Sequence, residues 1–354
     1  MRRRDSSFRA PSVVRHRLRA PLAGAAAVTL LAATATAGAA TPRAPRAATL
    51  HVAISVPSVL YSNGRQAWVA NTGKSSVLEL SASSGRELLN VTGSRFHLDN
   101  SDAIVQYGND VWVSNAASDA VTEFYSKSGA LKHVLKGPKF HFAIPAAIVV
   151  ADQHVFVLAQ TGDKITEINE RTGRLVRYLQ GPRYHLVRAV AMVHVGNDVW
   201  VASHGGSLTE LSAATGGVMR VITASAARLD VPTAIATDGR YLFVANRHGS
   251  HLSVLSASTG AFVRVMTSSR LHLDRITSLA IVQGRLWMAS TWTHAAFVAG
   301  IRVSSGAPVV LSAHAYGYPA VFGDGHHVWV VDRIQSRVSE LDGRTGRAIH
   351  IISR

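Results

Sequence analysis

The chain has 354 residues, with 37 Lys and Arg against 21 Asp and Glu, a formal charge of +16 and no cysteine. The lack of cysteine excludes disulfides, iron–sulfur clusters, thiol catalysis and cysteine-ligated zinc. A chain of this length can bury enough apolar surface to form a stable core without disulfides, even when it is exported.

The first 40 residues differ from the rest of the sequence. Seven arginines between Arg2 and Arg19 precede an uncharged, alanine-rich stretch that ends in small residues around Ala37–Ala40. This order predicts a secretory signal peptide over residues 1–40. An uncleaved N-terminal anchor is the alternative, because no charged residue lies between Arg19 and Arg43. Residues 41–55 are expected to form a linker into the folded domain, and no membrane span is expected in the mature chain.

A unit of 42–44 residues then recurs over residues 56–354. Each copy has an aromatic residue within a run of β-branched and apolar residues, and a Ser-Gly or Thr-Gly turn about 17 residues later. Turn residues also precede each aromatic, as expected for tight hairpins that need positive φ. The aromatic residues are Trp68, Trp112, Phe156, Trp200, Phe243, Trp287 and Trp329.

Short strand-like runs fill the space between the turns. In the second copy they read "AIVQY", "DVWVSN", "AVTEF" and "LKHVL". Four such strands in each repeat of about 40–45 residues are typical of propeller blades. The sequence therefore predicts an all-β fold, a seven-bladed β-propeller of four-stranded antiparallel blades. The repeats are expected at about 56–100, 101–144, 145–188, 189–231, 232–275, 276–318 and 319–354.

The repeat resembles a known family. Trp68–Asn71, Trp112–Asn115 and Phe243–Asn246, with continuations such as "SVLELSASSG", are similar to the YVTN/NHL-type propeller repeat. The resemblance spans all the units and implies an exported or surface-associated binding scaffold, although lyases and lactone hydrolases occur on related propellers. Because one fold hosts many functions, function has to be inferred from the site residues.

Residues that recur in most blades are expected to be structural. The aromatics should pack between twisted sheets, and Phe96-His97-Leu98 should wedge its two apolar residues between blades while His97 bonds loop backbone or faces solvent. A glutamate recurs on the third strand, where we predict structural salt bridges or a solvated face. These glutamates are Glu79, Glu123, Glu167, Glu210 and Glu340.

Candidate ligand-binding residues lie where the repeat is broken. Blade six has about two extra residues between its second and third strands, a segment that carries Trp292 and His294. The loop that leaves this blade carries His314, Tyr316 and Tyr318. In a propeller these two kinds of loop emerge on the same face, here called the top face, so we predict an aromatic, histidine-containing binding patch.

A second candidate lies at the start of the innermost strands. Asp102 is the one carboxylate among the seven aligned positions there, whereas a calcium site needs six to eight oxygen ligands. No metal site, cofactor or catalytic residue is therefore predicted, and Asp102 is included in the ligand-binding set. Asp332 and Arg333 of blade seven are further candidates nearby.

These features favour an exported, monomeric, non-catalytic binding scaffold that is secreted or associated with the cell envelope. The alternative is an extracytoplasmic lyase or lactone-type hydrolase with a top-face site near blades six and seven. Without residues 1–40 the chain keeps 30 Lys and Arg against 20 Asp and Glu. Many of these basic residues are expected in the outermost strands. Possible partners are a protein, a glycan or an anionic envelope polymer. Nucleic acid is not expected, because no recognition motif accompanies the charge.

Overall fold

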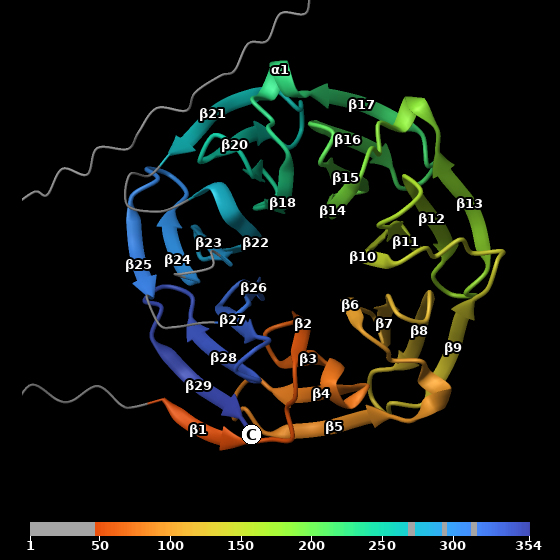
Figure 1. Cartoon of the computed structure of the whole chain (residues 1–354), viewed down its shortest axis with the longest axis vertical. Helices are drawn as coiled ribbons and strands as arrows, with labels where there is room; N and C mark the ends of the chain where they lie inside the picture. The colour runs from red at the N-terminus through yellow and green to blue at the C-terminus, as the bar shows by residue number, and fades with distance from the viewer. Residues whose placement is uncertain (1–46, 268–272, 292–295, 313–316) are drawn as a thin grey trace, which may run out of the picture. The chain divides into compact units, whose positions relative to one another are not determined.

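A computed structural model describes residues 47–354 apart from 268–272, 292–295 and 313–316. Seven β-sheets stand around a central channel, and in each of them four consecutive strands run antiparallel from the channel to the rim (Figure 1). The prediction of an all-β, seven-bladed propeller is confirmed. Strands are named a to d from the channel outwards, and the loops a–b, b–c, c–d and d–a after the strands that they join.

The strands of the first four blades have nearly equal lengths. Blade one contains β2 (Pro57–Ser62), β3 (Gln66–Asn71), β4 (Ser76–Ser81) and β5 (Glu87–Thr92). Blade two contains β6 (Ser101–Tyr107), β7 (Asp110–Asn115), β8 (Ala120–Tyr125) and β9 (Leu131–Lys136). Blade three contains β10 (Pro145–Ala151), β11 (His154–Ala159), β12 (Lys164–Asn169) and β13 (Leu175–Gln180). Blade four contains β14 (Ala189–Val195), β15 (Asp198–Ser203), β16 (Ser207–Ser212) and β17 (Val218–Thr223).

The last three blades repeat this pattern. Blade five contains β18 (Pro232–Thr237), β19 (Tyr241–Asn246), β20 (His251–Ser256) and β21 (Phe262–Thr267). Blade six contains β22 (Ile276–Val282), β23 (Arg285–Ser290), β24 (Phe297–Arg302) and β25 (Pro308–Ser312). Blade seven contains β26 (Pro319–Gly323), β27 (His327–Asp332), β28 (Arg337–Asp342) and β29 (Ala348–Ser353). Short helical turns lie in the loops: η1 (Thr72–Lys74), η2 (Ser94–Phe96), η3 (Pro182–Tyr184), α1 (Ala224–Ala227) and η4 (Leu273–Arg275).

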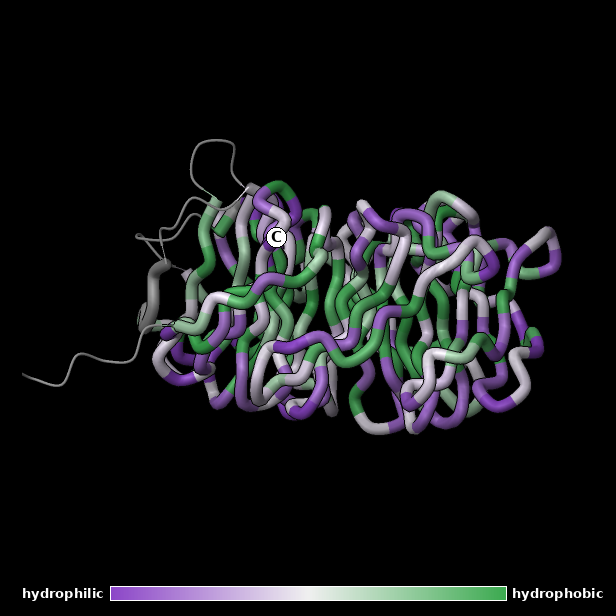
Figure 2. The backbone as a smooth tube through the Cα atoms, turned by 90° about the horizontal axis from the view of Figure 1, so that it is seen from below, coloured by the Kyte–Doolittle hydropathy of each residue, from purple (hydrophilic) through white to green (hydrophobic). Residues whose placement is uncertain are grey.

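The core is divided among the interfaces between blades. Buried hydrophobic side chains of the described residues form a separate cluster at each of the seven interfaces. All the recurring aromatics of strand b are fully buried in these clusters, as predicted. Figure 2 shows the result from the side, with apolar strands through the middle of the propeller and hydrophilic loops on both faces. Each blade thus depends on its two neighbours to bury its apolar faces.

The recurring histidine occupies a left-handed backbone position in the d–a crossing. Histidine is among the residues that are several-fold enriched at positive φ. The two residues beside His97, Phe96 and Leu98, are both 2 % exposed, and the Phe96 carbonyl accepts a hydrogen bond from Thr122 Oγ1. The motif is therefore structural, as predicted. The left-handed residues are His97 (φ 52°), His141 (φ 51°), His185 (φ 49°) and, in the fourth copy, Arg228 (φ 51°).

The glycine of each c–d turn also has a structural reason. These glycines have φ values between 63° and 71°, a conformation that other residues rarely adopt. Gly129 in addition lies against strand d of the preceding blade, so that a Cβ there would be 2.9 Å from Val91 Cγ2. The Ser-Gly and Thr-Gly turns of the sequence are thus contact points between successive blades.

The propeller is closed by a strand from the predicted linker. β1 (Ala48–His51) pairs in parallel with β29, adding a fifth strand to the outer edge of blade seven. Leu50 of this strand packs against the hydrophobic cluster shared by blades seven and one, and it contacts Gly85 of the blade-one c–d turn. At this interface Leu50 therefore adds to the contact that His350 of strand d in blade seven makes with the same turn.

Candidate binding surface on the top face

The recurring glutamates of strand c are internal groups. Glu123 forms ion pairs with Lys132 and His133, and three of the others pair in the same way within their own blades. Such pairs are seen for Glu167 with Arg177, Glu210 with Arg220 and Glu340 with His350. Glu79 is buried with no ion pair among the described residues. The predicted structural salt bridges are confirmed for four glutamates. These carboxylates are therefore not candidates for ligand binding or acid–base chemistry.

One of these glutamates should make stability depend on pH. Burial raises the pKa of Glu167 from its ordinary value of 4.5 to about 7, and Arg177 offsets part of that increase. Between these values the native state binds more protons than the unfolded state, so its stability falls as the pH rises. We expect the wild type to lose about 3 kcal/mol more than Glu167→Gln between pH 4.5 and 8.

Urea denaturation at the two pH values measures this difference. Glu87→Gln, at an exposed position of strand d, is the matched control and should follow the wild type. The explanation fails if Glu167→Gln loses as much stability as the wild type over the same interval.

The start of strand a is used mainly to join blades. Ser58 Oγ donates to the Ser101 carbonyl of the next blade at 2.5 Å, and Thr233 Oγ1 donates to the Ile276 carbonyl at 2.7 Å. Asp102 occupies the same position in blade two but makes no such bond within the described part of the chain. Burial raises the pKa of Asp102, and the nearby Arg333 guanidinium offsets part of the increase. Asp102 therefore lies at the top mouth of the channel, close to a cation from another blade.

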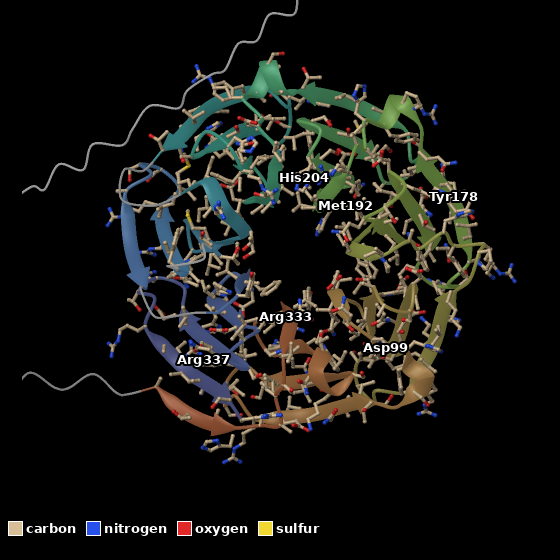
Figure 3. The ribbon with its side chains drawn as sticks, in the orientation of Figure 1. Asp99, Tyr178, Met192, His204, Arg333 and Arg337 are labelled. Atoms are coloured by element: carbon tan, nitrogen blue, oxygen red, sulfur yellow. The ribbon has the colours of Figure 1, made fainter. Side chains whose placement is uncertain are left out.

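Arg333 connects three parts of this mouth. Its backbone N–H donates to the Tyr318 carbonyl at 3.4 Å, which fixes the b–c loop of blade seven against the preceding d–a loop. Its guanidinium donates to Asn100 Oδ1, in the d–a loop that joins blades one and two, at 3.2 Å. Two residues of the predicted set, Asp102 and Tyr318, are thus both neighbours of Arg333, whose label in Figure 3 lies beside the channel.

Exposed apolar side chains flank this arginine. Tyr318 is 56 % exposed and Ile334 is 65 % exposed. Ile334 lies directly against Gly317, where a Cβ would be 2.3 Å from the Ile334 Cβ. Tyr318, Arg333 and Ile334 together, with Asn100 and Asp102 beside them, are called the blade-seven patch below.

The other predicted site residues lie outside the described parts of the chain. Their placement beside the blade-seven patch therefore stays a prediction. These residues are Trp292, His294, His314 and Tyr316.

A group of one histidine and two arginines on the far side of the mouth was missed by the sequence analysis. His204 and Arg247 follow strand b in blades four and five, at the position that Arg333 takes in blade seven. The His204 N–H donates to the Arg188 carbonyl at 3.1 Å. Burial lowers the pKa of His204, and the charges of Arg188 and Arg247 lower it further. Alignment of the residue after each strand b would have revealed this group.

Comparison with known proteins places the chain in a family. A family model matches residues 51–266, which is more than half of the chain. The chain belongs to the family described as outer membrane protein assembly factor BamB. No curated protein matches the chain in sequence.

The BamB family assignment bears on the resemblance found in the sequence. Membership in a family of propeller repeats is confirmed, and the family that matches is the BamB family. Among solved structures, the computationally designed Ika8 protein is similar at a TM-score of 0.62 and 16 % identity, over 87 % of this chain and 90 % of that chain. At this identity the likeness shows the fold alone. None of the helices in the described ranges of this BamB family member is long and apolar enough to cross a membrane.

Proposed function

We propose that the protein is an exported, non-catalytic interaction scaffold that holds a protein partner against the top face of its propeller. The observation that carries this proposal is the blade-seven patch. Tyr318 and Ile334 expose apolar surface on either side of Arg333, whose guanidinium is held by Asn100. Aromatic residues and arginine are the types that dominate the energetics of protein interfaces, especially when their side chains are already ordered.

Polar groups inside the blades recur from blade to blade, whereas those at the top mouth vary, and this difference supports the proposed role as a scaffold. The strand-c glutamates and the d–a crossing motif recur from blade to blade and bond within the fold. The residues at the top mouth differ from blade to blade, as Arg333, Arg247 and His204 show. Chemistry that varies on a constant framework is typical of binding surfaces carried by loops. We include the predicted Trp292, His294, His314 and Tyr316 in this surface.

The location outside the cytoplasm rests on two further observations. Residues 1–40 have the order of a secretory signal, and the matching family is described by its role in assembling outer membrane proteins. The strand-b endings in asparagine keep a YVTN/NHL-like character, which we propose marks a subgroup of exported propellers. In the structure this asparagine is internal, since Asn115 Nδ2 donates to Thr122 Oγ1 at 3.0 Å.

A paired substitution tests the proposed surface. In the native host, Arg333→Ala with Ile334→Ala should weaken the binding of a recovered partner about 30-fold or more, as loss of interface hot spots does. Leu88→Ala, at a side chain that is 53 % exposed on the outer strand of blade one, is the control and should bind normally. Affinity is measured by titration of the purified partner, and melting temperatures verify folding. Equal affinity of all three proteins would contradict the proposal.

A further inference from the structure

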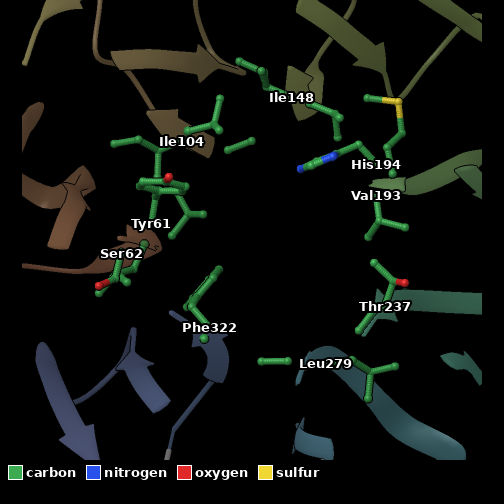
Figure 4. Close-up of a pocket in the computed structure, with 18 of the residues that line it drawn as sticks. Tyr61, Ser62, Ile104, Ile148, Val193, His194, Thr237, Leu279 and Phe322 are labelled. Carbon is green, nitrogen blue, oxygen red and sulfur yellow. The ribbon is translucent and has the colours of Figure 1, made fainter. Parts of the chain in front are cut away.

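The channel has a second feature at the opposite end from the blade-seven patch. The last residues of strand a from every blade enclose a cavity of about 620 Å³, called the lower channel cavity. It opens toward the face that carries the a–b turns. Figure 4 shows its wall, to which Tyr61, Ile104, Ile148, Val193, His194, Thr237, Leu279 and Phe322 contribute.

The wall of this cavity is mainly apolar. In each blade, the strand-a residue directly before the one that pairs with the strand-b aromatic carries an aliphatic side chain. This ring consists of Leu60, Ile104, Ile148, Met192, Ile235, Leu279 and Val321. Pockets for small molecules typically have volumes of about 300–1,000 Å³, apolar walls and a few polar groups that fix orientation. The lower channel cavity has the first two properties.

Most polar groups of the cavity wall already form hydrogen bonds with other residues of the protein. Gln106 Oε1 accepts from Trp68 Nε1 at 3.0 Å, Ser62 Oγ donates to Asp324 Oδ2 at 2.8 Å, and Thr237 Oγ1 donates to the Tyr241 carbonyl at 2.9 Å. These groups stabilise the a–b turns and have little capacity left for a ligand.

Tyr61 and His194 are different. Neither the Tyr61 hydroxyl nor the His194 ring has a hydrogen-bond partner among the described residues. The two side chains lie on opposite walls of the cavity, and the His194 ring points into it (Figure 4). The Tyr61 hydroxyl is protonated at neutral pH and can donate a hydrogen bond. An apolar cavity with free polar groups on opposite sides suits a ligand with an apolar body and polar ends.

We propose that the lower channel cavity binds a small, uncharged aromatic or alicyclic compound that carries carbonyl or hydroxyl groups. The ring system of the ligand lies against the seven aliphatic side chains from Leu60 to Val321. Tyr61 donates a hydrogen bond to an acceptor at one end of the ligand, and His194 binds a polar group at the other end. This site is independent of the blade-seven patch, because it uses the opposite mouth of the channel and shares no residue with it.

The probe for this proposal is Nile red, a neutral planar dye with a carbonyl group whose emission increases in apolar surroundings. Titration of the full-length protein should give a saturable site with one dye per chain. Tyr61→Phe and His194→Ala should each weaken binding about five- to tenfold, the effect of one lost hydrogen bond. Val193→Trp, which fills part of the cavity, should weaken it more than tenfold.

Two controls separate the cavity from the outer surface. Met219→Ala removes an apolar side chain that is 52 % exposed on β17, and Tyr125→Phe removes a hydroxyl on the outer part of blade two. Neither should change dye binding. Melting temperatures show whether Val193→Trp is folded, and the two polar variants decide the result if it is not. The proposal is overturned by the absence of saturable binding, by unchanged affinity in Tyr61→Phe and His194→Ala, or by loss of binding in Met219→Ala.

Discussion

Replacing Leu50 with aspartate is expected to destabilise the propeller by about 3 kcal/mol or more, although the residue lies just before the first blade. Leu50 packs against the cluster that joins blades seven and one, and its strand pairs with β29. Leu50 is partly buried, so the substitution removes part of the roughly 1.5–3 kcal/mol that full burial of a leucine contributes, and it also places a charge against apolar surface. Urea denaturation monitored by tryptophan fluorescence measures the loss.

Thr49→Asp is the matched control for this effect. Thr49 belongs to the same strand but is exposed, so the same charge there should cost little. Equal destabilisation by the two substitutions would show that the backbone pairing of β1, and not the packing of Leu50, closes the ring.

Trp112→Ala should cost about 3–5 kcal/mol, the usual range for removal of a large aromatic side chain from a core. Trp112 is fully buried at the interface between blades two and three. Trp112→Phe should cost about 1 kcal/mol, because Phe156 and Phe243 occupy the same position in other blades. In addition, the Trp112 Nε1–H donates to no described group, so no hydrogen bond is lost.

Trp68→Phe extends the comparison to an indole that is hydrogen-bonded. Trp68 Nε1 donates to Gln106 Oε1 at 3.0 Å, so Trp68→Phe should cost about 1 kcal/mol more than Trp112→Phe. Free energies of unfolding from urea titrations compare the three variants. A cost for Trp112→Phe as large as that for Trp112→Ala would contradict this account of the blade interface.

The blades could be predicted because their signals are local. The aromatic of strand b and the glycine of the c–d turn recur at a constant spacing, and each is required by the backbone or the packing of its own blade. The structural role of the His97 motif was predicted for the same reason, since its apolar neighbours point to burial. The left-handed conformation of His97 explains why this residue type recurs.

Features that depend on long-range geometry were not accessible from the sequence. Residues 48–51 form only four residues of strand, and their partners lie at the other end of the chain. The contact of Arg333 with Asn100 joins residues that are 233 positions apart in the sequence, which the repeat pattern does not show. The lower channel cavity was missed because its aliphatic residues have the same pattern as a core strand.

The pairing of β1 with β29 also sets the order of events during folding. Ala48 meets His350, so the first strand of the domain to be synthesised has to wait for the last one before its backbone is paired. Contacts of such high sequence separation form late and slowly. Individual blades can assemble earlier, but the ring cannot close while the C-terminal residues are still being made. The interface of blades seven and one is therefore completed only when β29, near the C-terminus, is present to pair with β1.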